Sequence, residues 1–172
     1  MRVLGIDPGS RVTGWGVVEA QGTRLAHVAN GTIPLPTAAS MAERFARLHA
    51  ECLRLVRAWA PAAVVLERAF VARNVQSAFR LGEARGAVLA AIGATGASLH
   101  EYAPAAVKLA TVGDGRADKA AIGRGVALRL GLGRAPVADA ADALALALCH
   151  LHQVPLARAV ASALGTRPGA RP

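Results

Sequence analysis

Lysine is scarce in this chain of 172 residues: Lys108 and Lys119 are its only lysines, and the other eighteen of its twenty basic residues are arginines. Acidic residues are also few, at eleven, so the formal net charge is +9 and the isoelectric point is about 11.3. A positive field of this size attracts polyanions, such as the phosphate backbone of nucleic acid or an anionic membrane surface. Charge alone does not choose between these partners.

Long apolar runs and paired cysteines are absent too. The apolar run over residues 143–149 is far too short to span a bilayer, and Met1 and Arg2 lead directly into a strand-like segment without the apolar region of a signal peptide. Cys52 and Cys149 form no CxxC pair and lie in apolar helical patterns, so we expect reduced thiols in the core. These features predict a cytoplasmic protein that does not bind membranes.

The chain has the length of one ordinary domain, which excludes a second large one. No acidic residue follows Asp142, whereas three arginines do, and the chain ends in GTRPGARP. Terminal segments of this composition are commonly unstructured. We therefore expect a single domain over residues 1–155 and a basic, disordered tail over residues 156–172.

Apolar periodicity divides the chain into five strands and five helices. Strand patterns occupy residues 3–7, 12–20, 24–33, 62–67 and 98–102, and helical patterns occupy 40–60, 74–92, 104–112, 119–130 and 138–152. A strand reached through a long helix is most simply a parallel neighbour of the first strand, joined by a crossover. The order of these elements predicts an α/β fold with a mixed five-stranded sheet of order 3-2-1-4-5 flanked by helices.

The helical pattern over residues 40–60 has an apolar and a charged side. The residues expected to face the core are Met41, Phe45, Leu48, Cys52, Leu55, Val56 and Trp59. Those expected to face solvent are Glu43, Arg44, Arg47, Glu51, Arg54 and Arg57. Pro61 ends this helix. For the helix that follows the fourth strand, Asn74 is the expected N-cap.

Two acidic residues occupy the last positions of apolar strands. Asp7 follows VLGI and Glu67 follows AAVVL. If these strands are parallel neighbours, both carboxylates emerge at the sheet edge where α/β folds bind ligands. Asp139 and Asp142 lie three residues apart in the first turn of the last helix, so they share one face of it. The four carboxylates are therefore expected to share one pocket.

Each acid has an ordinary structural alternative: Asp7 caps a turn, Glu67 is a solvated strand end, and the two later aspartates complement a helix dipole. These alternatives are harder to accept for all four acids at once. Carboxylates that lie together repel one another unless cations neutralise them, so their gathering favours a cation site. Carboxylate oxygens without Cys or His partners suit Mg²⁺ or Mn²⁺. A basic protein whose acids gather at one metal site is a candidate phosphodiesterase.

Four segments carry a resemblance to a known family. GIDPGSRVTGWGVVE, VVLERAFVARNVQSAFRLGEARG, YAPAAVKLATVGDGRADK and ADAADALALA occur in this order and spacing, over roughly residues 2–152. Together they resemble RuvC, the family of bacterial Holliday-junction endonucleases. The resemblance implies an RNase H-like fold and a structure-selective endonuclease of DNA recombination and repair. It also implies paired, symmetric, metal-dependent nicks with 5′-phosphate and 3′-hydroxyl ends.

By this resemblance Asp7, Glu67, Asp139 and Asp142 match the catalytic, metal-binding acids of the family. Such acids hold two ions, Mg²⁺ or Mn²⁺, in each active site. Asp7 stands in the decapeptide GIDPGSRVTG, whose Gly and Pro residues are typical of backbone that turns sharply or approaches a ligand. The resemblance implies that this turn brings backbone close to the scissile phosphate.

Further DNA contacts are implied around the second acid. Phe70 lies between Arg68 and Arg73 in ERAFVARN, and the sequence alone favours a core aromatic at this position. In RuvC-like proteins an aromatic at the matching place stacks on a base near the crossover. We expect Arg11, Arg68 and Arg73 to contact DNA as well.

Both lysines match family positions near the scissile phosphate. In a chain that otherwise uses arginine, Lys108 and Lys119 at these places suggest a need for a compact, flexible ammonium, although two cases also arise by chance. Asp114 and Asp118 flank the same loop and place negative charge where DNA should pass. Their role is open.

Small residues recur every four positions in the helix over residues 74–92, at Gly82, Gly86 and Ala90. This spacing allows close backbone approach, either to the sheet or to a symmetry mate. A two-fold junction needs two matched cuts, so we expect a homodimer through this helix. The resemblance also implies a four-way DNA junction as substrate, the RuvA–RuvB branch-migration complex as partner and a location at the nucleoid.

Three rival interpretations stay open at this point. GIDPGSRVTG also resembles the first phosphate motif of the actin and sugar-kinase superfamily, but that fold needs a duplicated second half, for which 172 residues leave no room. Another nuclease family of the same fold is expected to lack ERAFVARN and ADAADA. A basic DNA-binding module without activity explains the charge but not four spaced carboxylates.

Overall fold

The structure, a computed structural model, describes residues 1–68 and 75–163, with side chains as far as residue 154. Its elements are β1 (Arg2–Asp7), β2 (Val12–Gln21), β3 (Arg24–Pro34), α1 (Met41–Trp59), β4 (Ala63–Glu67), α2 (Val75–Gly93), β5 (Leu99–Tyr102), α3 (Pro104–Val112), α4 (Lys119–Leu130) and α5 (Ala138–Ala163). Every expected strand and helix is present, mostly within two residues of its expected bounds. The expected N-cap Asn74 lies outside the described residues.

The five strands form one mixed sheet of order β3-β2-β1-β4-β5, which confirms the predicted order. β1 and β2 pair antiparallel with Asp7 opposite Gly14, and β2 continues into β3 as a hairpin. β4 lies parallel to β1 with Ile6 opposite Leu66, and β5 lies parallel to β4. The long crossover through α1 is what makes the parallel pairing of β1 and β4 possible.

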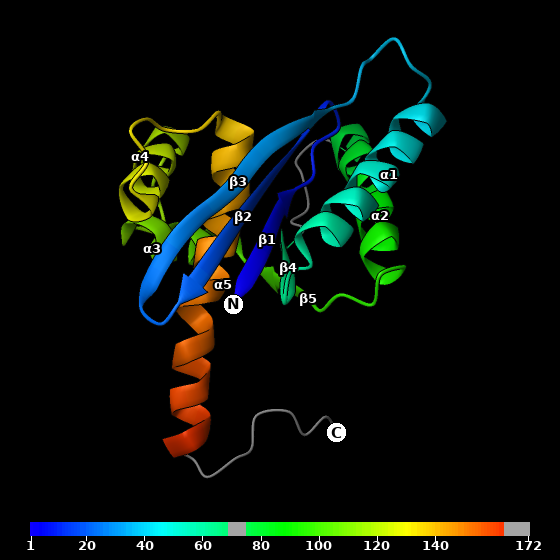
Figure 1. The fold of residues 1–172 in the computed structure, drawn as a ribbon. Coiled ribbons are helices and arrows are strands. Elements are labelled where there is room, and N and C mark those ends of the chain that lie inside the picture. Colours follow the sequence, from blue (N-terminus) through cyan, green and yellow to red (C-terminus); the bar gives the residue numbers. More distant parts are fainter. Residues whose placement is uncertain (69–74, 164–172) are drawn as a thin grey trace.

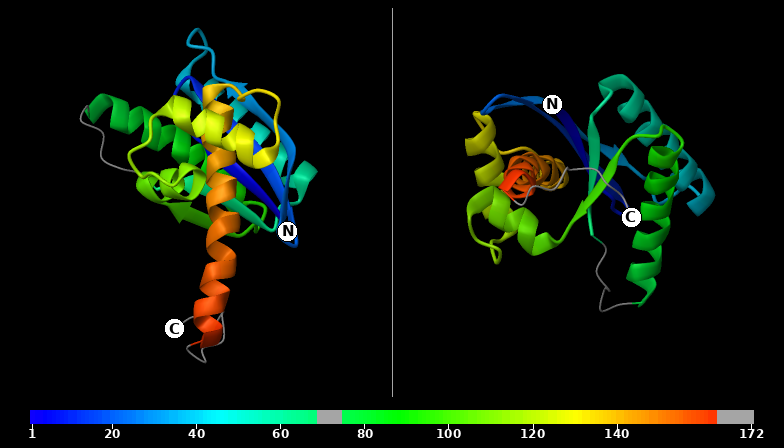
Figure 2. Two further views of the ribbon diagram at one scale, coloured as in Figure 1. Left: turned by 90° about the vertical axis from the view of Figure 1, so that its left-hand side faces the viewer. Right: turned by 90° about the horizontal axis from the view of Figure 1, so that it is seen from below.

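Helices cover both faces of the sheet, α1 and α2 on one side and α3, α4 and α5 on the other (Figures 1 and 2). Alternate residues of β1 serve the two layers, because successive side chains of a strand point to opposite faces. Leu4 and Ile6 are buried with α1 and α2, whereas Val3 is buried against α5 and its neighbours. The central strand is therefore enclosed on both faces, and only its ends reach solvent.

Local signals fix where the helices begin. Ser40 and Glu43 form a reciprocal capping box at the start of α1. Asp118 caps α4 by accepting a hydrogen bond from the amide of Ala121 at 2.7 Å. Asp114 accepts from the amide of Arg116 at 2.9 Å and so closes the turn before α4. These contacts give both loop aspartates a structural role.

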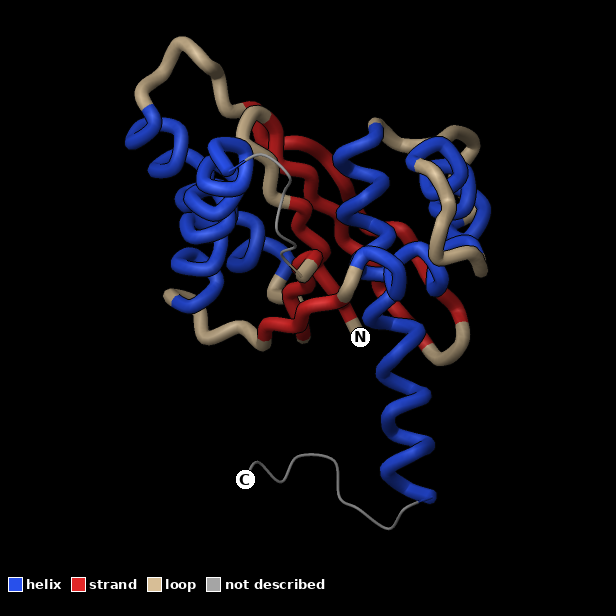
Figure 3. The backbone as a smooth tube through the Cα atoms, turned by 180° about the vertical axis from the view of Figure 1, so that it is seen from behind, coloured by secondary structure: helices blue, strands red, loops and turns tan. Residues whose placement is uncertain are grey.

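Helix α5 is longer than expected, running to Ala163 instead of about residue 152. Its first half packs across β1 and β2 through a row of fully buried small and apolar side chains, and its second half projects beyond the sheet (Figures 1 and 3). Within the described residues, no helix has the length and apolarity needed to cross a membrane. The backbone is helical over residues 156–163, where a disordered tail was expected, and disorder of residues 164–172 stays a prediction because they lie outside the described part.

Two residues of α1 are not where the helical period placed them. Met41 is 37% exposed, whereas Arg44, expected to face solvent, is only 9% exposed. The guanidinium of Arg44 donates to the backbone carbonyl oxygen of Ser10, and its other terminal nitrogen lies 3.3 Å from the sulfur of Met41. Arg44 therefore turns inward, although the helical period predicts that it faces solvent, because it finds a backbone hydrogen-bond acceptor on the loop after β1.

Candidate active site

Two of the four candidate acids lie side by side at one edge of the sheet. Asp7 is the last residue of β1, Glu67 is the last residue of β4, and the parallel register of these strands brings both ends to the same edge. Each carboxylate is half-buried. This placement agrees with the expectation drawn from the strand ends.

The other two acids begin α5, which crosses the same edge. Gly14 lies opposite Asp7 in the sheet, and a Cβ atom at Gly14 would lie only 1.9 Å from the backbone oxygen of Asp139. Only glycine therefore lets the start of α5 approach β2 this closely. Asp139 and Asp142 are both half-buried, one helical turn apart.

The turn after Asp7 is closed by its own contacts. A Cβ atom at Gly9 would lie 2.1 Å from the backbone oxygen of Val12, and the buried hydroxyl of Thr13 accepts from the amide of Gly9 at 3.3 Å. In this structure the close approaches at Gly9 and Gly14 are to the chain's own backbone. The packing of the chain against itself therefore explains why glycine stands at these two positions. An approach of the turn to a phosphate stays a prediction.

A cavity of about 290 Å³ lies between the strand ends, the start of α5, and helices α3 and α4. Its lining consists of Asp7, Glu67, Pro104, Val107, Lys108, Lys119, Ile122, Asp142 and Ala145. Three of the four candidate acids and both lysines therefore share it, although they come from segments far apart in the sequence. Asp139 is not part of the lining and lies one turn before Asp142 on α5.

Burial and neighbouring acids raise the pKa of Asp7 and Glu67. Burial raises the pKa of Asp7 to about 7, and the nearby charges of Asp142, Glu67 and Asp139 add to the rise. Burial, with a contribution from Asp142, also raises the pKa of Glu67, whereas Lys108 and Lys119 lower it. The cavity thus gathers negative charge that its own lysines only partly offset.

Lys119 is the cation most directly engaged with the acids. It is the first residue of α4, and its ammonium donates to the carboxylate of Asp142 at 3.0 Å. This hydrogen bond and the charge of Asp142 raise the pKa of Lys119. Its side chain is 75% exposed, so its charge stays accessible from the solvent side of the cavity.

The donor set fits hard divalent cations in its chemistry. It consists of carboxylates alone, and a bound cation would relieve the repulsion that raises the pKa of Asp7. Within residues 1–68 and 75–163, no three His, Cys, Asp or Glu side chains stand close enough together to hold an ion as they are arranged. Asp142 accepts a hydrogen bond from Lys119 in this arrangement.

Comparison with known proteins assigns the family. The family model for the crossover junction endodeoxyribonuclease RuvC matches residues 3–150. The RuvC of Alkalilimnicola ehrlichii is 49% identical over 152 residues, which cover 88% of this chain and 92% of that protein. This chain belongs to the RuvC family.

Solved structures agree with this assignment. Thermus thermophilus RuvC superposes with a TM-score of 0.82 at 35% sequence identity and covers 91% of this chain and 97% of that one. T. thermophilus RuvC in complex with a Holliday junction substrate gives a TM-score of 0.83 at 33% identity, with coverage of 91% and 96%. The predicted RNase H-like, RuvC-type fold is confirmed.

Not every RuvC-like DNA contact predicted from the sequence lies in the described part of the chain. Phe70 and Arg73 fall within residues 69–74, which the structure does not describe. Arg11 and Arg68 are exposed, Arg11 on the turn after Asp7 and Arg68 directly after Glu67. Arg68 thus adjoins a candidate acid in the chain, and the contact of both arginines with DNA stays a prediction.

The small-residue row expected at the RuvC dimer interface faces away from the sheet. Gly82, Gly86 and Ala90 are exposed, and a Cβ atom at either glycine would meet no described atom within 4 Å. The sheet-facing side of α2 is instead made by Ala84, Val88, Ala91 and Ile92. Packing of the row against the sheet is thereby excluded, and its contact with a second chain stays a prediction.

Sequence reasoning missed two arginines that donate hydrogen bonds to backbone carbonyl oxygens close to the candidate acids in the sequence. Arg44 on α1 holds the carbonyl oxygen of Ser10, and Arg85 on α2 donates to the carbonyl oxygen of Glu67 at 2.7 Å. The only sequence signal for Arg85 was its position beside the core-facing Ala84. Since both arginines act across 18 to 34 residues of sequence, a local pattern does not reveal them.

Proposed function

We propose that this chain resolves four-way DNA junctions by metal-dependent phosphodiester hydrolysis. The observation that carries the proposal is one cavity, in a chain of the crossover junction endodeoxyribonuclease family, that joins Asp7, Glu67 and Asp142 with two lysines. Neither a duplicated kinase-like fold nor a simple basic binding module accounts for that arrangement. We expect nicks with 5′-phosphate and 3′-hydroxyl ends.

Asp7, Glu67, Asp139 and Asp142 are the residues we expect to hold two cations, Mg²⁺ or Mn²⁺. Bound there, such ions activate water and stabilise the charge that develops on the scissile phosphate. The chain's own contribution is to hold the carboxylates on rigid elements: Asp7 ends the central strand of the sheet, and the aspartates of α5 are set by the close contact at Gly14.

The two lysines have a different expected task. Lys108 on α3 and Lys119 on α4 line the cavity opposite the strand ends. Their ammonium groups bring positive charge to the place where a phosphodiester must lie to reach the acids. We expect them to bind and orient the scissile phosphate and to offset its charge during cleavage.

Two matched cuts across a junction with two-fold symmetry call for two active sites. We propose a homodimer that packs through the exposed row Gly82, Gly86 and Ala90 of α2. Arg11, Arg68, Arg73 and Phe70 are the expected contacts to the junction arms near each site. The RuvA–RuvB branch-migration complex is the expected partner in the cell.

The test is a cleavage assay on a synthetic four-way junction and on linear duplex of the same sequence, with Mg²⁺, with Mn²⁺ and with chelator. We expect symmetric nicks on the junction alone and only with a divalent cation. Equal cleavage of duplex would contradict junction selectivity. Tight junction binding without nicks under either metal would favour a binding module without activity.

A further inference from the structure

Arg85 of α2 reaches the end of the strand that carries Glu67. Its Nη1 donates to the backbone carbonyl oxygen of Glu67 at 2.7 Å, and its Nη2 pairs with the carboxylate of Glu101 on β5. The side chain is 14% exposed, so the guanidinium is largely removed from solvent. One residue thus ties α2, β4 and β5 together at a candidate catalytic acid.

The end of β4 is held from two directions. The amide of Arg68 donates to the carbonyl oxygen of Tyr102 at 2.7 Å, which continues the pairing with β5 one residue beyond Glu67. Arg85 holds the carbonyl oxygen of Glu67 itself from the α2 side. The peptide from which the Glu67 side chain departs is therefore fixed on both sides.

The pair with Glu101 orients the guanidinium for this task. A guanidinium is a planar fork whose nitrogens donate in fixed directions, so one nitrogen bound to Glu101 aims the other at the Glu67 carbonyl oxygen. A lysine has a single nitrogen and does not reproduce that geometry.

We infer that Arg85 is a positioning residue for the carboxylate of Glu67, which it sets through the backbone at the end of β4. The inference rests on the proposed function, in which Glu67 helps to hold the catalytic cations. Arg85 does not line the cavity and touches no reacting atom there. Loss of a group that orients a metal-binding side chain commonly costs about 10- to 100-fold in metal affinity or activity.

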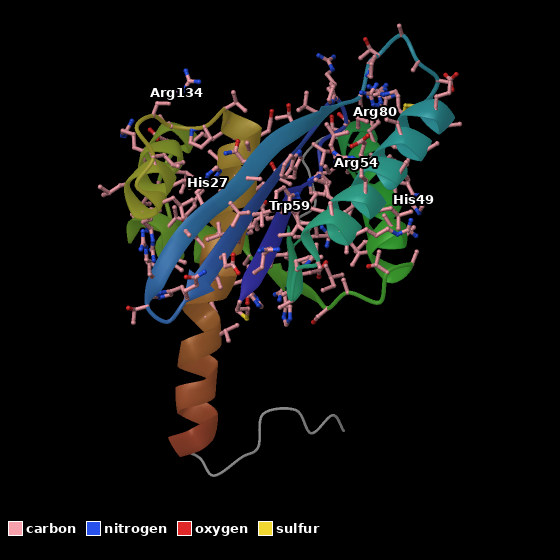
Figure 4. The ribbon with its side chains drawn as sticks, in the orientation of Figure 1. His27, His49, Arg54, Trp59, Arg80 and Arg134 are labelled. Carbon is pink, nitrogen blue, oxygen red and sulfur yellow. The ribbon has the colours of Figure 1, made fainter. Side chains whose placement is uncertain are left out.

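A purely structural arginine would behave differently. Arg54 on α1 offers a matched comparison, because it pairs with Glu51 at 2.8 Å on an exposed helix surface (Figure 4). Exposed pairs of this kind contribute little to stability. Arg54→Met therefore removes the same side chain and an ion pair at a place without contact to the cavity.

The experiment compares Arg85→Met, Arg85→Lys and Glu101→Gln with wild type and Arg54→Met. For each we would measure the single-turnover rate of junction cleavage, the Mg²⁺ concentration at half-maximal rate, and junction affinity in chelator. Calorimetric titration of Mn²⁺ into the DNA-free protein gives a readout that does not depend on cleavage. Circular dichroism and thermal melting establish that each variant is folded.

We expect Arg85→Met to cleave at least about tenfold more slowly, to need several-fold more Mg²⁺ and to bind Mn²⁺ more weakly. Junction affinity in chelator should stay within about threefold of wild type. Arg85→Lys should be closer to Arg85→Met than to wild type, because it keeps the charge but not the fork. Glu101→Gln should lie in between, and Arg54→Met should match wild type.

Cleavage and Mn²⁺ affinity of Arg85→Met within twofold of wild type would overturn the inference and leave Arg85 as a link between α2 and the sheet. If Arg85→Met does not fold, Arg85→Lys and Glu101→Gln decide by the same two measurements. If wild type binds junctions but cleaves none, the proposed function fails, and unchanged Mn²⁺ affinity in the three variants would then overturn the role of Arg85 as well.

Discussion

Asp7 is the residue at which stability and function oppose each other. Its folded-state pKa of about 7 lies above the ordinary value of 3.8, chiefly because of burial and then because of its acidic neighbours. Between these pH values the folded chain binds a proton that the unfolded chain does not. The metal-free fold therefore gains stability as pH falls from about 7 toward 4, and it bears the full cost of the charge above pH 7.

Asp7→Asn should therefore stabilise the metal-free protein and abolish its activity. At pH 8 with chelator we expect the free energy of unfolding to rise by a few kcal/mol, and at pH 5 this gain should shrink. Junction cleavage should fall by at least about a thousandfold, since one acid of the metal site is lost. Denaturant melts at the two pH values and a junction assay provide the measurements.

Two results would argue against this account of Asp7. Retained cleavage by Asp7→Asn would remove it from the catalytic acids. A gain in stability that is the same at pH 5 and pH 8 would mean that the neutral side chain packs better, with no contribution from charge. Junction affinity in chelator serves as the control for correct folding and should stay unchanged.

At the scale of elements, the contact between β2 and α5 sets the second pair of acids. Gly14→Ala would place a Cβ atom 1.9 Å from the backbone oxygen of Asp139, so the start of α5 must shift. We expect a loss of roughly 1–3 kcal/mol in stability. Because the shift carries Asp139 and Asp142 with it, we expect cleavage to fall at least about 100-fold.

Gly93→Ala is the matched control for that substitution. Gly93 ends α2, and a Cβ atom there meets nothing within 4 Å. We expect unchanged cleavage and equal or slightly higher stability. Wild-type cleavage by Gly14→Ala would show that the position of α5 relative to β2 does not govern the site.

The exposed row on α2 makes a second prediction at this scale. A Cβ atom at Gly86 meets nothing within 4 Å among the described residues, so the higher helix propensity of Gly86→Gln should raise monomer stability by about 0.5–1 kcal/mol. The longer side chain should block close approach of a second α2 and weaken self-association at least tenfold. Sedimentation velocity over a range of concentrations measures the latter, and an unchanged dimer affinity would move the interface elsewhere.

Most of the strands and helices could be predicted from the sequence because each follows from a local pattern of apolar residues. The strand-end acids Asp7 and Glu67 could be placed together, since parallel order brings the ends of β1 and β4 to one edge. The full length of α5 could not be predicted, because proline usually ends or kinks a helix and α5 continues past Pro155 to Ala163. The contacts of Arg44 and Arg85 could not be predicted, because their partners are backbone atoms far away in the sequence.

At the scale of the whole molecule, a chain with a net charge of +9 contains a cavity lined by three carboxylates. The net positive charge favours DNA in general, and in the proposed function the acids bind cations next to the scissile phosphate. A chain of this composition should therefore bind many DNA forms at low salt and cleave few. Under the proposed homodimer, selectivity depends on geometry, that is, on two sites held at a fixed separation.

The measurement that tests this claim most directly uses a supercoiled plasmid that extrudes a cruciform, with its relaxed form as control. Two coupled sites should convert the supercoiled plasmid directly to linear product in Mg²⁺, with little nicked circle and no reaction in chelator or on relaxed plasmid. Accumulation of nicked circle without linear product would contradict the two-site assembly. Equal attack on relaxed plasmid would contradict junction resolution itself.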